Sequence, residues 1–382
     1  MNKKQLGYKI YGAIANVFRV FPKNKRKTVF YMVHNDHFQG NLRYMYDAMK
    51  KERPEDKYIV VSKSQLFSGG LWKKCKGAFY FYFVLNYHFA TAGRIFLNDN
   101  FLPLGEMPIK KGTQVVQFWH GVGAWKRFGL TTETDPVTRH AVEKGNQKIT
   151  HLFVSAKRIV PFYEEAFGVP KERIYPVGLP VLDFYFSDER RAKAREHFFA
   201  QYPQLRGKKM LLYTPTFRRT AEENQQLLEQ LDAEKLSDML GEEWAILLRL
   251  HPSLQGSALT QREDGSLRSV VEVSAYPDVK ELYEVADVLV NDYSSTMVEF
   301  ALLQKPIVLF AYDLEDYDRG FYADYTACAP GPIVRDLVSL AEEVKREQVD
   351  PEKLERFLAL HYDKEGMDGN NVSRIRSILE QQ

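Results

Sequence analysis

Residues 287–310, DVLVNDYSSTMVEFALLQKPIVLF, contain a strand, a polar turn, a helix and a second strand in direct succession. The runs Val288–Val290 and Ile307–Phe310 are short, continuous and apolar, as is typical of parallel strands buried on both faces. Between them, Met297 and Phe300 are three residues apart, which is the spacing of one helical face. The stretch therefore predicts a β-α-β unit, the building block of a doubly wound sheet.

The same alternation of short apolar strands and helical segments continues on both sides of this unit. Further strands are predicted at Thr28–Val33, Tyr58–Val61, Arg94–Leu97, Gln114–Trp119, His151–Val154, Ile174–Val177, Met210–Tyr213, Trp244–Leu250 and Val270–Val273. The charged segment 187–209 separates the strands into two sets. Two such sets predict an α/β fold of two doubly wound parallel-sheet domains, residues 28–190 and 191–382, which face a central cleft.

The composition is that of an ordinary globular protein. Of 382 residues, 45% are apolar and 27% charged, which excludes a disordered or collagen-like chain. The net charge of +3 gives no field that would require a nucleic-acid partner. Cys75 and Cys328 cannot form a disulfide framework, so a reducing compartment is expected. The chain has no Walker loop, GxGxxG, CxxC or HExxH pattern, and neither a metal nor a cofactor is expected.

Two segments, 1–27 and 71–94, are basic, aromatic and free of acidic residues. Residues 1–27 lack the continuous apolar stretch of a signal peptide, and the apolar run in 71–94 is too short to span a membrane. Lysines beside aromatic residues are typical of a bilayer interface, so residues 1–27 are predicted to form a basic amphipathic segment on an anionic membrane surface. The lysines expected to contact lipid are Lys3, Lys4, Lys9, Lys73, Lys74 and Lys76. A helix packed on its own domain is the alternative for each segment.

Polar residues suited to binding an anion stand directly after four of the predicted strands. They are His120, His251, the pair Thr216 and Arg218, and the hydroxyl residues Ser294, Ser295 and Thr296. The last three open the helix of the 287–310 stretch, where backbone N–H groups and the helix dipole favour negative charge. Ligands of such folds bind beyond the carboxyl ends of the strands, so these turns together predict a diphosphate site, with Glu299 placed to bind a ribose. Taken singly, each residue also has a structural interpretation, as a helix cap, a structural histidine or a solvated arginine.

Two further polar loops are given no function. The run Asp313–Asp316, with Asp318, has no histidine or cysteine beside it and is interpreted as a solvated loop. Residues Asn98–Asn100 follow a strand but lack the spacing of a calcium-binding loop.

A series of motifs resembles one known family. WHGVGAWKRFG (119–129), GLPVLD (178–183), LLYTPTFR (211–218), LRLHP (248–252), DVLVNDYSSTMVEFALLQKPIVLFAYDLEDY (287–317) and PGP (330–332) resemble the CDP-glycerol glycerophosphotransferase family of teichoic acid synthesis. The resemblance implies a GT-B-like fold and a peripheral enzyme on the cytoplasmic face of the cell membrane. Such an enzyme would move glycerol phosphate from CDP-glycerol to an undecaprenyl-diphosphate-linked disaccharide, or to an acceptor primed with glycerol phosphate, and release CMP.

The resemblance also implies roles for individual residues. His120 matches the WHG histidine, the expected general base, and His251 matches the HP histidine beside the donor diphosphate. The remaining donor-binding positions are Thr216 and Arg218 in TPTFR, Asp292, Ser294, Ser295 and the adjacent Thr296 in the DYSS turn, and Glu299, where many relatives have aspartate.

The sequence departs from the family pattern in two places. WHGVGAWKRFG is closer to a short, primase-like branch than to the WHGTPLK of polymerases, and the length is expected to leave no room for the N-terminal region that many polymerases carry. Val181 stands where an arginine often follows the proline, which puts an acceptor-phosphate contact there in doubt. Ribitol-phosphate transfer from CDP-ribitol, sugar transfer from a nucleotide sugar, and a non-catalytic membrane scaffold are left open as alternatives. Self-association is also left open.

Overall fold

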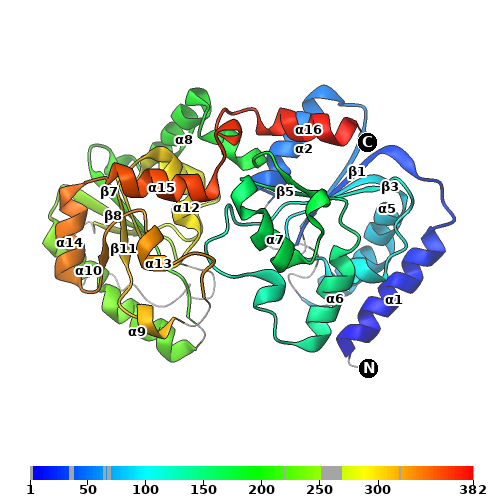
Figure 1. Ribbon diagram of the computed structural model, residues 1–382, viewed down its shortest axis with the longest axis horizontal. Coiled ribbons are helices and arrows are strands. Elements are labelled where there is room, and N and C mark those ends of the chain that lie inside the picture. The colour runs from blue at the N-terminus through cyan, green and yellow to red at the C-terminus, as the bar shows by residue number, and fades with distance from the viewer. Residues whose placement is uncertain are drawn as a thin grey trace. The chain divides into compact units, whose positions relative to one another are not determined.

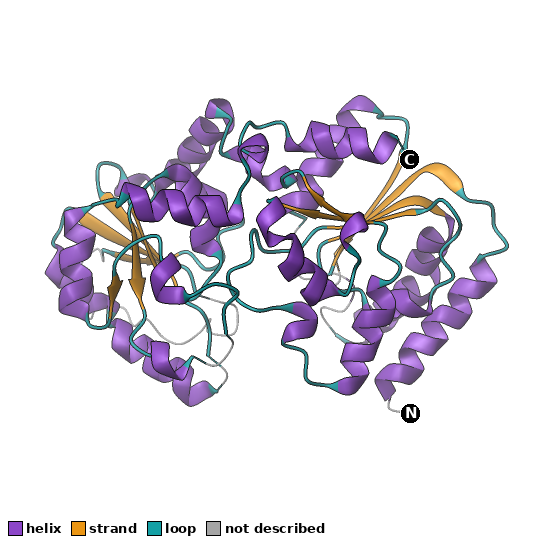
Figure 2. Ribbon diagram, in the orientation of Figure 1, coloured by secondary structure: helices purple, strands orange, loops and turns teal. Residues whose placement is uncertain are grey.

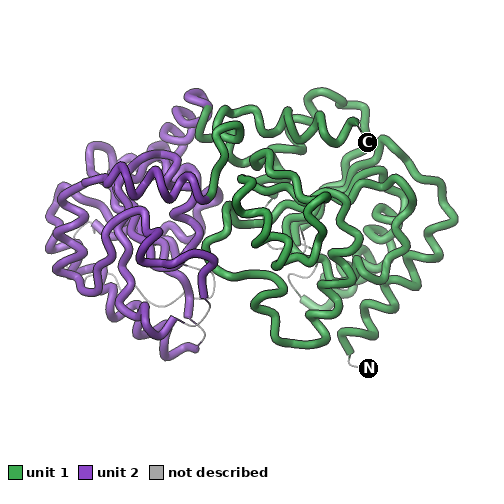
Figure 3. The backbone as a smooth tube through the Cα atoms, in the orientation of Figure 1, with its two compact units in different colours: residues 1–186, 361–382 green, residues 187–360 purple. Residues whose placement is uncertain are grey.

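The computed structural model describes residues 3–33, 38–62, 66, 70–218, 220–250, 269–317 and 320–381. The chain divides into two compact units (Figure 3). Unit 1 comprises residues 1–186 and 361–382, and unit 2 comprises residues 187–360. Each unit contains one six-stranded sheet in which all neighbouring strands are parallel, flanked by helices (Figures 1 and 2).

The sheet of unit 1 has the strand order β2-β1-β3-β4-β5-β6. Its strands are β1 (Asn24–Met32), β2 (Lys57–Ser62), β3 (Ala92–Leu97), β4 (Gln114–Gln117), β5 (His151–Val154) and β6 (Ile174–Pro176). The α-helices of this unit are α1 (Lys3–Phe18), α2 (Gly40–Glu52), α4 (Leu71–Phe79), α5 (Asn86–Thr91), α6 (Pro136–Asn146), α7 (Val160–Phe167) and α16 (Asn371–Glu380).

The sheet of unit 2 has the strand order β12-β11-β10-β7-β8-β9. Its strands are β7 (Lys209–Thr214), β8 (Trp244–Leu248), β9 (Val270–Glu272), β10 (Val288–Asn291), β11 (Ile307–Phe310) and β12 (Ile333–Val334). The helices between the two stretches of unit 1 are α8 (Asp188–Gln201), α9 (Ala221–Leu231), α10 (Ala233–Leu240), α11 (Val279–Val285), α12 (Thr296–Phe300), α13 (Tyr325–Cys328), α14 (Leu337–Arg346) and α15 (Pro351–His361), the last of which ends on the first residue of the second stretch. The predicted pair of parallel-sheet α/β domains is confirmed.

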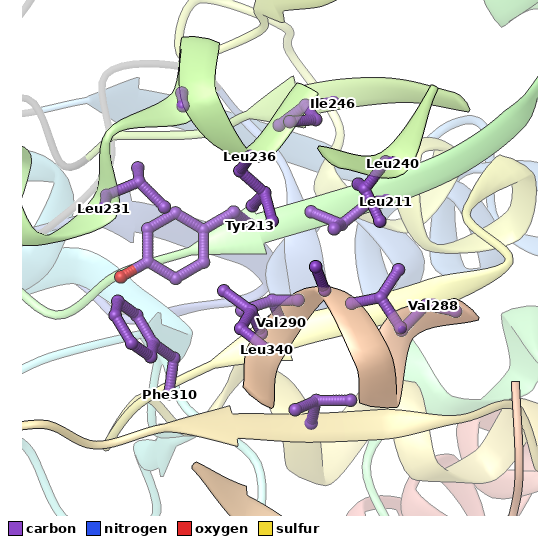
Figure 4. Packing of buried hydrophobic residues seen from close by; sticks show 14 of the residues in the cluster. Leu211, Tyr213, Leu231, Leu236, Leu240, Ile246, Val288, Val290, Phe310 and Leu340 are labelled. Carbon is purple, nitrogen blue, oxygen red and sulfur yellow. The ribbon is translucent and has the colours of Figure 1, made fainter. Parts of the chain in front are cut away.

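The core of unit 2 explains why its strands are continuously apolar. One face of the sheet packs against α9, α10 and α14, with Leu236 and Leu340 in contact with the strands (Figure 4). Leu211 and Tyr213 of β7 point to this face, because alternate side chains of a strand lie on the same side. All four residues of β10 are buried, as a strand covered on both faces requires.

Helix α1 packs on unit 1 through its small and aromatic residues. Tyr11 is fully buried, and its ring centroid lies 4.8 Å from that of Phe81. The approach to the short helix Leu102–Glu106 is close: a Cβ atom on Gly12 would lie 2.5 Å from the carbonyl oxygen of Glu106. The strand β1 begins at Asn24, so the end of the predicted segment 1–27 belongs to the sheet.

The second basic segment forms a helical stretch from α4 to α5, joined by the π-helical residues Tyr80–Leu85. Among the residues that the structure describes, nine of the twelve exposed large apolar side chains lie in segments 1–27 and 71–94, which leaves apolar surface there that the fold of unit 1 does not cover. They are Leu6, Ile10, Val17, Val20, Phe21, Leu71, Trp72, Phe79 and Phe83. Within the described ranges, no helix combines the length and apolar character needed to cross a membrane.

The C-terminal segment, which the sequence analysis assigned to the second domain, belongs to unit 1 (Figure 3). The carboxylate of Asp183 accepts hydrogen bonds from the backbone N–H groups of Asn371 (2.9 Å) and Val372 (3.1 Å) and from the side-chain amide of Asn371 (2.8 Å). These bonds satisfy donors at the start of α16 that no helical carbonyl can reach. The cap comes from a residue 188 positions away, which is why the local pattern did not indicate it.

Candidate active site

In unit 1, His120 stands just beyond the carboxyl end of β4 and faces a carboxylate from the neighbouring strand. Its Nδ1 atom lies 3.3 Å from Oδ2 of Asp99, which follows β3. The other oxygen of Asp99 accepts the N–H of Asn100 at 2.6 Å, so the carboxylate is held from both sides. From the sequence, residues 98–100 were interpreted only as lacking a calcium-loop spacing, and the pairing of Asp99 with His120 was not predicted.

Aromatic rings pack against the imidazole of His120. The ring of Trp119 lies 4.2 Å from that of His120, centroid to centroid, and Trp119 in turn stacks on Phe128 at 5.3 Å. The carbonyl oxygen of Trp119 accepts a hydrogen bond from the side-chain amide of Asn41 at 3.3 Å. His120 itself remains exposed, so the ring is both positioned and accessible.

The loop that follows His120 is fastened to the body of unit 1. The hydroxyl of Tyr163 donates to the carbonyl oxygen of Gly123 at 2.9 Å, and the N–H of Ala124 donates to Nδ1 of His361 at 3.4 Å. Burial lowers the pKa of His361 to about 3, so this ring is neutral at pH 7 and Nδ1 can accept. The C-terminal segment therefore helps to hold the WHG loop.

In unit 2, Asp292 holds two turns together. These turns, Thr214–Arg218 after β7 and Asp292–Thr296 after β10, follow adjacent strands of the sheet. Asp292 is fully buried, and its carboxylate accepts the N–H of Thr216 at 2.9 Å to each oxygen. The hydroxyl of Tyr325 donates to the carbonyl oxygen of Asp292 at 2.7 Å. We call these two turns, with Asp313, the unit-2 turn cluster.

Arg218 braces the same cluster. Its guanidinium donates to both oxygens of Asp313, at 2.6 and 2.9 Å, and to Asp292 at 2.9 Å. Burial alone would lower the pKa of Arg218, but the two carboxylates raise it, so the side chain stays charged. The interpretation of Asp313 as part of a solvated loop was wrong, because this residue pairs with Arg218 and accepts the hydroxyl of Tyr293 at 2.8 Å. Asp316 is exposed, and Asp318 lies outside the described residues.

The hydroxyl residues of the DYSS turn differ in how they are used. Thr296 Oγ1 lies 2.9 Å from Thr214 Oγ1, and Ser294 Oγ accepts the N–H of Thr296 at 3.4 Å. Ser294, Ser295 and Glu299 are half-buried. The predicted helix is present, but it is only five residues long, Thr296–Phe300.

Thr216 combines a fixed backbone with a side chain that has no partner in the described part of the chain. Its N–H is held by Asp292, whereas its Oγ1 is buried without a hydrogen bond. Buried hydroxyls are normally paired, so this one is suited to a ligand.

The remaining predicted residues divide into those the structure describes and one it does not. His251 lies outside the described residues, so its role stays a prediction. Arg249, two positions earlier, donates to the carbonyl oxygens of Val273 (3.3 Å) and Tyr276 (2.8 Å) and has a structural role. Among the described residues, no group of three or more His, Cys, Asp or Glu side chains is arranged to hold a metal ion.

The sequence matches one known protein family over most of its length. Residues 13–381 match the family described as CDP-Glycerol:Poly(glycerophosphate) glycerophosphotransferase. The chain belongs to this family. Among curated relatives, the teichoic acid poly(ribitol-phosphate) polymerase of Bacillus spizizenii is 30% identical over 97% of this chain and 59% of its own length. The teichoic acid ribitol-phosphate primase of the same species is 28% identical over 97% of this chain and 94% of its own length. The teichoic acid glycerol-phosphate primase of Bacillus subtilis is 28% identical over 66% of this chain and 65% of its own length.

Solved structures show the same fold. The wall teichoic acid polymerase TagF, in a histidine variant soaked with CDPG, superposes with a TM-score of 0.80 at 23% identity, covering 97% of this chain and 93% of the TagF chain. A UDP-GlcNAc 2-epimerase from Neisseria meningitidis superposes with a TM-score of 0.56 at 12% identity, over 93% of this chain and all of that chain.

Proposed function

We propose that this glycerophosphotransferase-family chain moves an alditol phosphate, glycerol phosphate in the first instance, from a CDP-alditol to a lipid-linked acceptor and releases CMP. The observation that carries the proposal is the family match over residues 13–381. The acceptor we propose is an undecaprenyl-diphosphate-linked disaccharide, either bare or already primed with glycerol phosphate. That the two units face each other across a cleft stays a prediction.

The reaction is an in-line displacement at phosphorus. An acceptor hydroxyl attacks the phosphorus that carries the alditol, and the bond from that phosphorus to the bridging oxygen breaks as CMP leaves. His120 takes the hydroxyl proton, because its ring is exposed and a neutral imidazole has one nitrogen that can accept a proton. His251 is proposed to act at the diphosphate.

Donor binding is assigned to the unit-2 turn cluster. The unpaired hydroxyl of Thr216 and the half-buried Ser294 and Ser295 are suited to phosphate oxygens, and Glu299 is suited to the ribose hydroxyls. Arg218 and Asp292 are engaged with each other. Their proposed contribution to donor binding is therefore to fix the shape of both turns.

Ribitol is the second candidate for the alditol. The poly(ribitol-phosphate) polymerase and the ribitol-phosphate primase each match over 97% of this chain. The test is incubation of the purified protein with CDP-glycerol, CDP-ribitol and UDP-sugars, with detection of CMP or UDP. The mass of the product formed on a synthetic lipid disaccharide then gives the alditol and the number of units added. Release of UDP, or of no nucleotide, would overturn the proposal.

We further propose that the protein works as a peripheral protein on the cytoplasmic face of the cell membrane. The support is the exposed apolar surface of segments 1–27 and 71–94, together with six exposed lysines: Lys3, Lys4, Lys9, Lys73, Lys74 and Lys76. Two other basic residues of the first segment are engaged in the fold, since Arg26 pairs with Asp56 at 2.7 Å and Lys27 is buried with its ammonium 4.7 Å from the ring of Tyr87.

Sedimentation with anionic vesicles tests this surface. Replacing Lys73, Lys74 and Lys76 by glutamine should weaken binding by about 1 kcal/mol for each lysine that lies near the lipid surface. The matched control replaces three exposed lysines of unit 2, Lys193, Lys345 and Lys353, and removes the same charge. Equal loss of binding in both triple variants would show that net charge, not this surface, governs sedimentation.

A further inference from the structure

The pair formed by Asp99 and His120 follows from the register of two neighbouring strands. β3 and β4 are parallel, Leu97 is opposite Gln117, and the N–H of Phe118 donates to the carbonyl oxygen of Leu97 at 2.9 Å. Asp99 lies two residues beyond this point on one strand and His120 three residues beyond it on the other. The sheet itself therefore brings the two side chains to the same edge.

The carboxylate of Asp99 is oriented by a backbone hydrogen bond as well as by the imidazole of His120. Its Oδ1 accepts the N–H of Asn100 at 2.6 Å, and the preceding residue, Asn98, accepts the N–H of Val33 at 2.8 Å. Oδ2 lies 3.3 Å from Nδ1 of His120. That distance is long for a charge-assisted bond, and such bonds at active sites often shorten only when substrate is bound.

We propose that Asp99 is the positioning residue for His120, a role that rests on the proposed function. By accepting a hydrogen bond from Nδ1–H, the carboxylate selects the tautomer in which Nε2 carries the lone pair. Nε2 is then the atom that takes the acceptor hydroxyl's proton, and Asp99 stabilises the imidazolium that results. Asp99 touches no reacting atom and passes on no proton.

The competing interpretation is an incidental surface ion pair. The side chains of His120 and Asp99 are 32% and 19% exposed, and an ion pair this accessible contributes little to folding. The two interpretations predict different behaviour when Asp99 is replaced. An incidental pair would leave both turnover and the imidazole tautomer unchanged, whereas a positioning residue would alter both and leave the fold intact.

The experiment compares Asp99→Asn with Asp99→Glu in the full chain. In Asp99→Asn, we expect kcat for CMP release to fall by a factor of about 10²–10⁴, the range expected when general-base catalysis is lost. The KM for CDP-glycerol should change by less than about threefold, because donor binding is assigned to the turns of unit 2 and Asp99 belongs to unit 1. Asp99→Glu retains a carboxylate and should recover part of the lost kcat. Thermal unfolding of both variants checks that they fold.

The second readout is the tautomer of His120, measured by ¹⁵N NMR of histidine-labelled protein and assigned with His120→Ala. The wild-type ring should be protonated on Nδ1, and Asp99→Asn should shift it toward the Nε2–H form. The matched control is Glu281→Gln, which breaks a second histidine–carboxylate contact, His197 Nδ1 to Glu281 at 2.6 Å, in unit 2. This control should leave kcat and the His120 signals unchanged.

The possible outcomes separate the inference from the proposed function. Wild-type kcat with an unchanged His120 tautomer in Asp99→Asn would overturn the inference. Full activity in His120→Ala, or no CMP release from any CDP-alditol by the wild-type protein, would instead overturn the proposed role of His120. The tautomer measurement needs no substrate, so it decides the positioning role in that case as well.

Discussion

Asp292 is the residue on which the unit-2 turn cluster depends most, and its replacement by asparagine tests that dependence. The side chain is fully buried and accepts the N–H of Thr216 and the guanidinium of Arg218, each at 2.9 Å. Asp292→Asn keeps the shape of the side chain but replaces one accepting oxygen by an NH₂ group. The new NH₂ group then faces another donor, either the N–H of Thr216 or the guanidinium of Arg218. The buried positive charge of Arg218 is then paired with one carboxylate, that of Asp313, instead of two.

The size of the effect follows from these contacts. Breaking a buried ion pair from one side costs about 3–5 kcal/mol, and leaving a buried donor unpaired costs about 1–3 kcal/mol. Asp313 still neutralises Arg218, so the lower end of the first range applies. We expect unit 2 to lose about 3 kcal/mol of its free energy of unfolding. At 1.4 kcal/mol per factor of ten, opening of the two turns becomes more frequent by a factor of about 10².

Hydrogen-exchange mass spectrometry measures this opening directly. Peptides that cover β7 and β10 should exchange about 10² times faster in Asp292→Asn, while peptides from β3 and β4 of unit 1 serve as the internal reference. Asp316→Asn is the matched control, since it removes a carboxylate from an exposed position of the nearby acidic run. An increase of less than about threefold in β7 and β10, or an equal increase in the control, would show that Asp292 does not hold the two turns.

Three further predictions concern single residues. Thr216→Val removes the unpaired buried hydroxyl, so unit 2 should be at least as stable as in the wild type. Steady-state assays should show a KM for CDP-glycerol raised by about tenfold or more, since a hydrogen bond to a charged group is worth about 1.5–3 kcal/mol. Burial lowers the pKa of His361 from 6.5 to about 3, so as the pH falls the unfolded chain binds a proton before the folded chain does. The free energy of unfolding should therefore fall below about pH 6.5, by up to about 1.4 kcal/mol per pH unit. Urea titrations at several pH values should show a flatter slope in His361→Asn. Asp183→Ala leaves the N–H donors at the start of α16 without their cap and should lower the free energy of unfolding of unit 1 by about 1–3 kcal/mol. Unchanged hydrogen exchange in α16 would contradict the capping role.

Much of the fold could be predicted from the sequence because its strands are buried on both faces. Continuous runs such as Val288–Val290 and Ile307–Phe310 stand out from the helical segments between them, and both are strands in the structure. The two-residue strand Ile333–Val334 was missed, since so short a run has no periodicity. The return of residues 361–382 to unit 1 was also missed, because it depends on contacts such as that of Asp183, far away in sequence.

The candidate site was predictable only in part. Thr216 and the DYSS turn were predicted because ligand-binding residues follow the carboxyl ends of parallel strands. The structure places them after the adjacent strands β7 and β10. The sequence did not show that Arg218 is fully engaged with Asp292 and Asp313, because an arginine after a strand gives no sign of its partners. Asp99 was visible as a carboxylate after a strand, but its significance depends on the pairing of β3 with β4, which the sequence does not state.

The route of the chain through the two units has a consequence for the order in which they form during synthesis. Residues 187–360 are one uninterrupted stretch, so unit 2 is complete as soon as that stretch has left the ribosome. Unit 1 must wait for residues 361–382, since α16 and the His361 anchor of the WHG loop are made only after all of unit 2. The loop that carries the proposed base is therefore secured after the unit proposed to hold the donor can already have folded.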